Sequence, residues 1–362
     1  RGALVTADGN AQGYLDTFDL VTRLIREGKV AAAWKPGIGG VAEGIFNMAL
    51  GNRIGFDFAG DVALETLFQK LPGAFILETE EQIGVTLGHT TEAYTLALGS
   101  ETVDMAEMEA LWANVLEPVF PSKVAGSKAV PVETFSWQAK ARVSPRSSVA
   151  KPRALIPVFP GTNCEYDSAR ALELAGAVPE IFVVRNLTSK DVAESAEAFA
   201  GRLAASQNVF LPGGFSGGDE PDGSAKFITA FLRSPRIAAE VHRLLTARDG
   251  LMGGICNGFQ ALIKLGLVPY GEIREPDADA PTLTYNAIGR HQSRMVRVRV
   301  ASDKSPWLMH AKVGDVYTAP TSHGEGRFVC PEALLHALAA NGQVATQYVD
   351  LDDQATMDIL YN

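Results

Sequence analysis

Cysteine is scarce in this sequence, which has only Cys164, Cys256 and Cys330 among its 362 residues. So few cysteines exclude a disulfide framework, and because their spacing fits no zinc-binding pattern, no metal site is expected. No run of about 18 apolar residues occurs, which argues against a transmembrane helix and a membrane partner. With no visible signal peptide, the expected compartment is the cytoplasm.

Basic residues are also in deficit: 32 Lys and Arg stand against 42 Asp and Glu, for a net charge of −10. A protein that neutralises many backbone phosphates needs the opposite balance, so no nucleic-acid partner is expected. Apolar residues are plentiful at 46%, enough for real hydrophobic cores. A length of 362 residues predicts roughly two to three domains.

The domain boundaries follow from composition. Residues 121–151 are rich in Pro, Ser and Lys without an apolar period, which predicts a linker. Helical and strand-like patterns over residues 1–120 predict a smaller α+β domain before it. The abrupt start at Arg1 and the apolar end at Asn362 favour a piece of a longer protein, whose second domain, residues 152–362, is truncated at its C-terminus.

Strand and helix patterns alternate regularly in the second region. Such alternation predicts an α/β fold with a parallel sheet flanked by helices. Ligands on such sheets bind at the carboxyl ends of the strands. Strict alternation over residues 294–300 predicts a further, antiparallel strand. The expected strands are 154–159, 180–185, 208–211 and 251–255, and the expected helices are 164–175, 191–206, 225–246 and 258–264.

Cys256 lies between an apolar strand and an apolar helix, with Gly254 and Gly258 on either side. Flanking glycines permit a sharp strand-to-helix turn that holds the central side chain in a strained, exposed elbow. The N-terminus of the following helix favours the thiolate, the reactive form of a nucleophile. A buried core cysteine is the alternative. We interpret Cys256 as the nucleophile because both glycines are present.

A second glycine-rich segment, residues 212–219, closes the strand that precedes the nucleophile strand. It is expected beside Cys256 at the same edge of the sheet. There its backbone N–H groups and that of Asn257 would face a developing oxyanion. The segment lacks the Lys-Ser/Thr ending of a phosphate-binding loop, and a plain flexible turn is the alternative.

These two motifs, in this order, resemble those of class I glutamine amidotransferases. The wider pattern over residues 152–362 is similar to phosphoribosylformylglycinamidine synthase of the single-chain type. Residues 1–120 resemble the C-terminal part of its synthetase domain, which is aminoimidazole ribonucleotide synthetase-like, with residues 35–44 in the place of a Gly-rich turn. The segments that carry the resemblance in the second region are 159–165, 212–219, 254–260, 289–294 and 322–328.

The resemblance implies an ATP-dependent carbon–nitrogen ligase of purine biosynthesis that takes its nitrogen from glutamine. Cys256 would attack the glutamine carboxamide and form a γ-glutamyl thioester. The substrate-binding residues would be Gly213, Gly214, Asn257 and Gln260, with Gly214 and Asn257 N–H groups forming the oxyanion hole.

The same resemblance implies the partners and cofactors. The released ammonia would pass to the upstream synthetase domain of the same chain, which converts formylglycinamide ribonucleotide to formylglycinamidine ribonucleotide. ATP and Mg²⁺ would bind that domain, mostly upstream of Arg1, and the amidotransferase domain would hold no cofactor.

The general base is the open point. A cysteine glutaminase needs a histidine, and that histidine needs a carboxylate to orient it. His323 and Glu325 have the His-x-Glu spacing and are the candidate pair in this sequence. Family members carry a second His-x-Glu nearer their C-terminus, so the triad pair is alternatively expected beyond Asn362, with His323 in a loop near the glutamine.

Two other functions remain open from the sequence. One is another cysteine-elbow hydrolase of the same topology. The other is a module that binds glutamine or a partner without turnover. In the first region, the turn at residues 37–40 is either a phosphate-binding turn or a simple entry into a helix.

Overall fold

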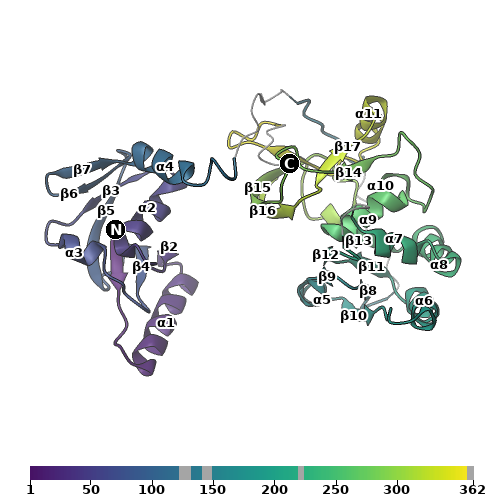
Figure 1. The fold of residues 1–362 in the computed structure, drawn as a ribbon, viewed down its shortest axis with the longest axis horizontal. Helices are drawn as coiled ribbons and strands as arrows, with labels where there is room; N and C mark the ends of the chain where they lie inside the picture. Colours follow the sequence, from purple (N-terminus) through teal and green to yellow (C-terminus); the bar gives the residue numbers. More distant parts are fainter. Residues whose placement is uncertain (122–131, 141–148, 219–223, 357–362) are drawn as a thin grey trace. The chain divides into compact units, whose positions relative to one another are not determined.

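The computed structural model describes residues 1–121, 132–140, 149–218 and 224–356, and the chain divides into two compact units, Arg1–Pro121 and Ser122–Asn362 (Figure 1). Most of the expected linker, together with Asp219 and the apolar C-terminal run, lies outside the described residues.

The first unit is an α+β structure built on one sheet of strand order β2-β4-β1-β5-β3-β6-β7. Its neighbouring strands are antiparallel, except for the parallel pair β3 and β6. The strands are β1 (Gly2–Val5), β2 (Val30–Trp34), β3 (Gly55–Phe58), β4 (Phe75–Thr79), β5 (Val85–Thr91), β6 (Thr95–Leu98) and β7 (Glu101–Asp104). The helices are α1 (Ala11–Arg26), α2 (Gly40–Leu50), α3 (Leu64–Leu67) and α4 (Met105–Asn114).

Helices α1 and α2 cover opposite faces of this sheet. Successive side chains of a strand point to opposite faces, and in β4 Leu77 packs with Val21 of α1 while Ile76 packs with Ile45 of α2. Helix α1 begins where the Asn10 side chain accepts a hydrogen bond from the Gly13 N–H. Such a cap satisfies a backbone donor that the first turn leaves unpaired.

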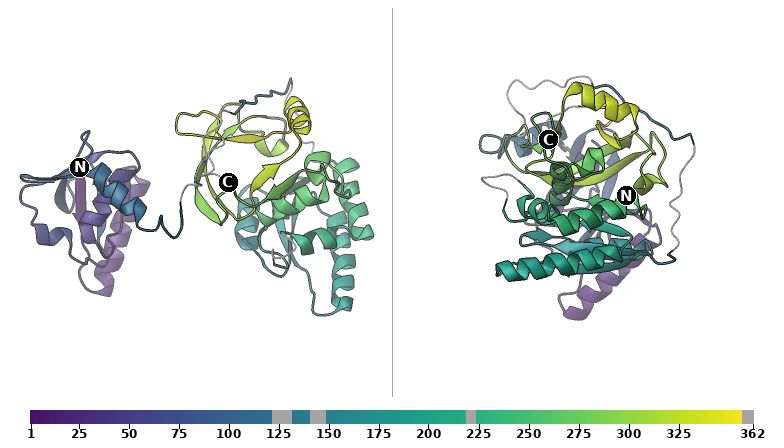
Figure 2. Two further views of the ribbon diagram at one scale, coloured as in Figure 1. Left: turned by 45° about the horizontal axis from the view of Figure 1, so that its top comes forward. Right: turned by 90° about the vertical axis from the view of Figure 1, so that its right-hand side faces the viewer.

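The second unit contains the expected parallel sheet, of strand order β10-β8-β11-β13 (Figure 1), and Figure 2 shows the helices of this unit on both sides of the sheet. Its strands are β8 (Arg153–Val158), β10 (Val178–Val183), β11 (Asn208–Leu211) and β13 (Leu251–Gly254). Its helices are α5 (Glu165–Leu174), α6 (Ser189–Ala204), α7 (Lys226–Leu232), α8 (Pro235–Thr246), α9 (Asn257–Leu265) and α10 (Leu267–Tyr270). The prediction of a parallel sheet flanked by helices is therefore confirmed.

One expected element is wrong in its extent. The helix expected over residues 225–246 is two helices, α7 and α8, which break between Leu232 and Pro235. Proline has no N–H to donate and its ring clashes with the preceding turn, so it is tolerated only in the first turn of a helix. Pro235 accordingly begins α8.

The core of the second unit lies on both faces of the parallel sheet. Leu155 and Leu211 face a cluster that includes Phe199 of α6 and Leu262 of α9, all buried. Ile156, the neighbour of Leu155, belongs to a separate cluster with residues of α5. Helix α9, which follows the nucleophile candidate, is thus packed directly on the strands that position it.

Antiparallel strands extend the second unit beyond the parallel sheet. Strand β15 lies between β16 and β18, β14 pairs with β17, and β9 pairs with β12. Residues 132–140, in the expected linker, contact this part of the unit, since Trp137 N–H donates to Ala301 O over 2.8 Å. These strands are β9 (Thr162–Asn163), β12 (Gly213–Gly214), β14 (Thr282–Thr284), β15 (Gln292–Val300), β16 (Val316–His323), β17 (Arg327–Val329) and β18 (Thr346–Val349), with the 3₁₀ turn η1 (Pro306–Leu308) and helix α11 (Glu332–Ala340).

Candidate functional site

Cys256 lies in a sharp turn between β13 and α9. Its backbone has φ +53° and ψ −112°, a conformation that costs an L-residue free energy. Such strain persists where the surrounding structure over-determines the turn. The thiol is partly accessible and its Sγ lies 3.6 Å from Ser322 O. The expected elbow is therefore present in the backbone geometry.

Two glycines make the turn possible. A Cβ on Gly258 would collide with the carbonyl of Leu211 in β11, and a Cβ on Gly254 would lie 2.7 Å from the backbone of Gly258. The first turn of α9 therefore packs against backbone rather than against side chains. This close approach directs the N-terminus of α9 toward Cys256. The next residue, Asn257, lies at the first helical position, where its backbone N–H has no acceptor within the helix.

The glycine-rich segment of residues 212–218 reaches Cys256 as expected. Strands β11 and β13 are neighbours with Leu211 opposite Gly254, so their carboxyl ends lie together. A Cβ on Gly213 would lie 3.3 Å from the Cys256 Cβ. Gly214 has φ +110° and packs against the backbone of Gly161 and of the two residues of β9, where any Cβ would collide. Glycine at positions 213 and 214 therefore permits the close approach of this segment to Cys256 and to β9.

A chain of buried amides connects this segment to α9 and to the loop after β16. Ser216 N–H donates to Asn257 Oδ1 over 3.1 Å, and Asn257 Nδ2 donates to Gln260 Oε1 over 2.9 Å. Gln260 Nε2 donates in turn to Glu325 O over 2.8 Å. All four residues are at least nine-tenths buried. Gln260 is therefore held in one orientation by partners at both ends of its amide.

His323 and Glu325 do not form a pair. The His323 Nδ1 lies 2.9 Å from Asn286 Oδ1, while Glu325 meets the site through its backbone carbonyl. The His323 Nε2 is buried without a hydrogen-bond partner. Burial and the nearby His291 lower the pKa of His323 below its ordinary value. Within the described part of the chain, no histidine nitrogen hydrogen-bonds to the Cys256 thiol.

Asn286 is the site residue that the sequence does not reveal. It is buried in the loop between β14 and β15, and it contacts His323 through Oδ1. A single asparagine in a loop has no spacing or periodicity that would mark it. The only signal was its place near the segment 289–294, which is part of the recognised pattern.

The other two thiols are unlike Cys256. Cys164 is exposed at the start of α5 with φ +67°, and its thiol lies 3.1 Å from Asn163 Oδ1. Cys330 is half-buried, and burial raises the pKa of its thiol. Neither lies in a strand-to-helix elbow between glycines.

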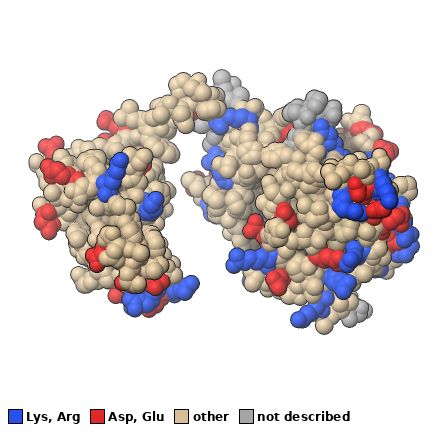
Figure 3. All heavy atoms as spheres, turned by 60° about the horizontal axis from the view of Figure 1, so that its bottom comes forward, with Lys and Arg blue, Asp and Glu red and all other residues tan. Residues whose placement is uncertain are grey.

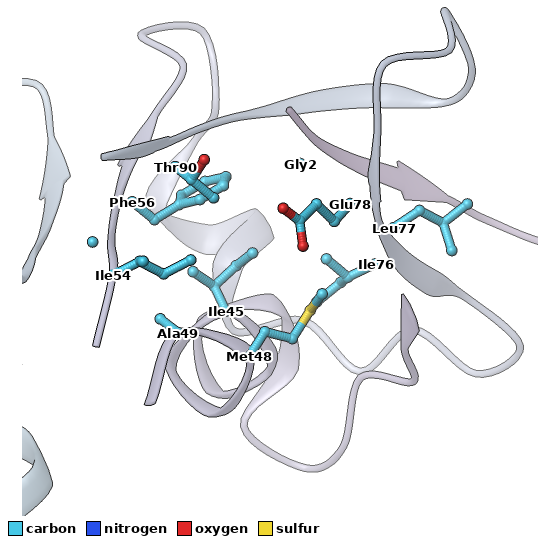
Figure 4. A pocket seen from close by; sticks show the side chains of 11 residues that line it. Gly2, Ile45, Met48, Ala49, Ile54, Phe56, Ile76, Leu77, Glu78 and Thr90 are labelled. Carbon is cyan, nitrogen blue, oxygen red and sulfur yellow. The ribbon is translucent and has the colours of Figure 1, made fainter. Parts of the chain in front are cut away.

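The first unit holds no comparable site in its described residues. The Glu43 carboxylate accepts a hydrogen bond from the Gly39 N–H over 2.9 Å, so an acid occupies the turn at residues 37–40 where a phosphate would need free donors. A pocket beside α2 is lined by Ile45, Met48 and Phe56, with the Glu78 carboxylate directed into it (Figure 4). Its volume of about 30 Å³ has room for roughly one water molecule.

Among the described residues, no group of three or more His, Cys, Asp or Glu is placed to hold a metal ion. No described helix combines the length and the hydropathy that a membrane span requires. On the face that Figure 3 shows, basic and acidic side chains are interspersed over both units.

Comparison with known proteins gives the class first. Residues 151–362 match the family described as the CobB/CobQ-like glutamine amidotransferase domain, and this match spans more than half of the chain. The second unit, with its elbow cysteine and adjoining glycine loop, is thus a glutamine amidotransferase domain. The chain belongs, within that class, to the PurQ family.

The two relatives described next are both named phosphoribosylformylglycinamidine synthase subunit PurQ. The protein of Treponema denticola is 35% identical over 216 residues, which cover 57% of this chain and 75% of the relative. That of Symbiobacterium thermophilum is 34% identical over 196 residues, covering 53% and 69%. Among solved structures, PurLQS from Thermotoga maritima is 26% identical and covers 57% of this chain and 80% of its own, with a TM-score of 0.41.

Proposed function

We propose that the second unit hydrolyses glutamine at Cys256 and supplies ammonia for the synthesis of phosphoribosylformylglycinamidine in purine biosynthesis. The observation that carries this proposal is the strained elbow at Cys256, with Gly213 against its Cβ and the N-terminus of α9 directly behind it. Family membership over residues 151–362 and the name shared by the relatives support it.

In the proposed reaction the Cys256 sulfur forms a bond to the carboxamide carbon of glutamine. The carbonyl electrons move to oxygen, where the N–H groups of Asn257 and Gly214 stabilise the negative charge. The carbonyl then re-forms and the C–N bond breaks, as the nitrogen takes the proton that the thiol has lost and leaves as ammonia. Water then attacks the resulting γ-glutamyl thioester and releases glutamate and the thiol. Gln260, fixed by Asn257 and Glu325, would hold the bound glutamine.

The synthetase partner forms the second part of the proposal. We propose that residues 1–120 are the C-terminal part of a synthetase domain, joined to the amidotransferase as in single-chain enzymes of this type. The α+β sheet of the first unit supports this assignment. The described residues do not fit Mg²⁺ and ATP, because Glu43 occupies the glycine turn and no acidic cluster is present in that part of the chain. No step through ATP is therefore assigned to these residues.

Labelling tests the nucleophile. A glutamine analogue with an electrophilic carbon in place of the carboxamide should modify Cys256 and leave Cys164 and Cys330 unmodified. Iodoacetamide is the control, since it does not resemble glutamine and should also modify the exposed Cys164. The measurement is peptide mass spectrometry of the whole chain. Equal modification of all three thiols by the analogue would exclude a glutamine site at Cys256.

A second candidate function is glutamine binding without turnover. The specific observation that favours it is the absence, within the described residues, of a histidine on the Cys256 thiol. Expelling ammonia and activating water both need proton transfer, and a positioned acid–base group contributes about 10²–10⁴-fold. Glutamine that stabilises the protein against heat but yields no sustained ammonia would support this second function.

The rate of ammonia release by wild type and two variants tests whether His323 is the general base. Wild type, Cys256→Ala and His323→Ala should be compared over many turnovers. Cys256→Ala should lower the rate by up to about 10⁶-fold, as loss of a nucleophile does. We expect His323→Ala to cost much less, since its Nδ1 bonds Asn286 and its ring does not bond the thiol. A loss as large as that of Cys256→Ala would identify His323 as the base.

A further inference from the structure

Asn286 uses every polar atom that it has. Its backbone N–H donates to Gly324 O over 2.9 Å, and its backbone O accepts from Gly289 N–H over 2.9 Å. Its Nδ2 donates to His323 O over 2.7 Å and to Arg290 O over 3.0 Å. Its Oδ1 lies 2.9 Å from His323 Nδ1 and accepts from Gly326 N–H over 3.3 Å. A residue that is 3% exposed thus binds the segment of residues 323–326 at four points.

These bonds fix the chemistry of the amide and of the His323 ring. Because Nδ2 faces two carbonyl oxygens, the other end of the amide must be the oxygen. The neutral His323 therefore carries its proton on Nδ1 and donates it to Asn286 Oδ1, which leaves the buried Nε2 as an acceptor. One side chain sets both the backbone position and the tautomer of this segment.

The segment that Asn286 holds contacts helix α9, and the residue before it, Ser322 at the end of β16, contacts Cys256. Glu325 O accepts the hydrogen bond from Gln260 Nε2, and Ser322 O faces the Cys256 Sγ. Ser322 is held within β16, but the strands alone do not fix the Glu325 carbonyl. Strand β16 ends at His323 and β17 begins at Arg327, so residues 324–326 lie between the two pairings. Asn286 bonds to both Gly324 and Gly326 and so holds residues 324–326 from both sides of Glu325.

We propose that Asn286 is a positioning residue for glutamine binding: by bonding residues 323–326 it places the Glu325 carbonyl, and through it the Gln260 amide, at the Cys256 site. This inference rests on the proposed function. Asn286 does not contact the thiol, so its effect is on the affinity for glutamine and not on the reactivity of the sulfur.

The test separates affinity from reactivity. Inactivation of Cys256 by the electrophilic glutamine analogue is measured as a function of its concentration, in wild type and Asn286→Ala. We expect the half-saturating concentration to rise about 10-fold, the equivalent of roughly one buried hydrogen bond. The maximal inactivation rate and the rate of Cys256 alkylation by iodoacetamide should each stay within about 2-fold.

Two further variants keep the test informative. Ser302→Ala is the matched control, because Ser302 is 1% exposed and its hydroxyl donates to Gly342 O over 2.7 Å, remote in sequence and contact from the site. It should leave both labelling rates unchanged. If Asn286→Ala does not fold, Asn286→Asp replaces it, since the isosteric carboxylate keeps the acceptor for His323 and removes both donors. It should weaken analogue binding by a similar factor.

A spectroscopic readout addresses the His323 tautomer. The ring nitrogens of His323, followed by NMR, should report a proton on Nδ1 in wild type and a mixture of tautomers in Asn286→Ala. Analogue affinity unchanged in the variants would overturn the proposal, as would a parallel fall of analogue and iodoacetamide rates. Failure of wild type itself to take up the analogue at Cys256 would instead reject the proposed function.

Discussion

At the scale of single residues, the backbone of Cys256 makes a stability prediction that is independent of catalysis. Its φ of +53° strains any side chain that has a Cβ, but not glycine. Cys256→Gly should therefore be more stable than Cys256→Ala, by about 1 kcal/mol. Denaturant midpoints of the two variants measure the difference.

Cys330 provides the matched control for this comparison. It is not among the residues with positive φ, so glycine there brings only a loss of stability relative to alanine, about 0.5–1 kcal/mol. The order of the Gly and Ala variants should thus reverse between the two positions. The same order at both would mean that the elbow stores no strain.

His323 predicts a dependence of stability on pH. Burial and His291 lower its pKa in the folded protein, whereas the unfolded chain has the ordinary value near 6.5. Just below pH 6.5 the unfolded state therefore binds more protons, and the free energy of unfolding falls as the pH is lowered. In His323→Gln, the contribution of His323 to this pH-dependent loss in the free energy of unfolding should be absent.

The measurement for His323 is denaturation of the second unit at pH 7.5, 6.5 and 5.5. His310→Gln serves as the control, because His310 is exposed, and it should keep the wild-type slope. A slope that is identical in wild type and His323→Gln would contradict the buried neutral ring.

Some residues of the site could be identified from the sequence, and others could not. Cys256 and Gly213 are brought together as expected, because flanking glycines and strand order are local signals. The pairing of His323 with Asn286 could not be foreseen, since 37 residues separate them and only the meeting of two loops joins them. The roles of these residues in catalysis stay predictions until the labelling is done.

At the scale of helices and strands, Gly258 lies at the contact between α9 and β11. Gly258→Ala would push α9 away from the Leu211 carbonyl. We expect a loss of about 1–3 kcal/mol in the free energy of unfolding, the usual cost of overpacking. The labelling of Cys256 by the glutamine analogue should fall in parallel, because the elbow moves with the helix.

Gly201 in α6 is the control for Gly258. A Cβ added there meets no atom within 4 Å, so Gly201→Ala should raise stability by up to about 1 kcal/mol through helix propensity. Thermal or urea unfolding of both variants checks the pair. Equal changes in the free energy of unfolding for the two substitutions would show that α9 can move away from β11 without cost.

Elements with clear local patterns were predictable from the sequence, and the others were not. The strand Asn208–Leu211 has the expected bounds. Strand β16 was missed because its residues, Val316–His323, lack clear alternation and its formation depends on pairing with β15. The parallel sheet was foreseen because buried strands and helices alternate strongly along the chain.

At the scale of the whole molecule, each unit has its own hydrophobic core. Ile76 and Leu77 lie in clusters of the first unit, and Leu155 and Ile228 in one of the second. We therefore expect two unfolding transitions. Covalent labelling of Cys256 by the glutamine analogue should raise only the melting temperature of the second unit.

Core variants assign the two transitions. Ile76→Ala should lower one melting temperature and Ile228→Ala the other, each corresponding to about 2–5 kcal/mol. Differential scanning calorimetry is the measurement. A single transition that shifts with both variants would show that the units unfold as one.

The indole of Trp307 has a consequence for solubility. Strand β13 is an edge of the parallel sheet, and Trp307 Nε1 donates to its Met252 carbonyl over 3.2 Å while the ring lies against Gly253. An uncovered edge strand is a template for pairing with a second chain and for aggregation. Trp307 thus covers the edge strand that leads into Cys256, and its indole occupies a carbonyl that would otherwise be open to intermolecular β-pairing.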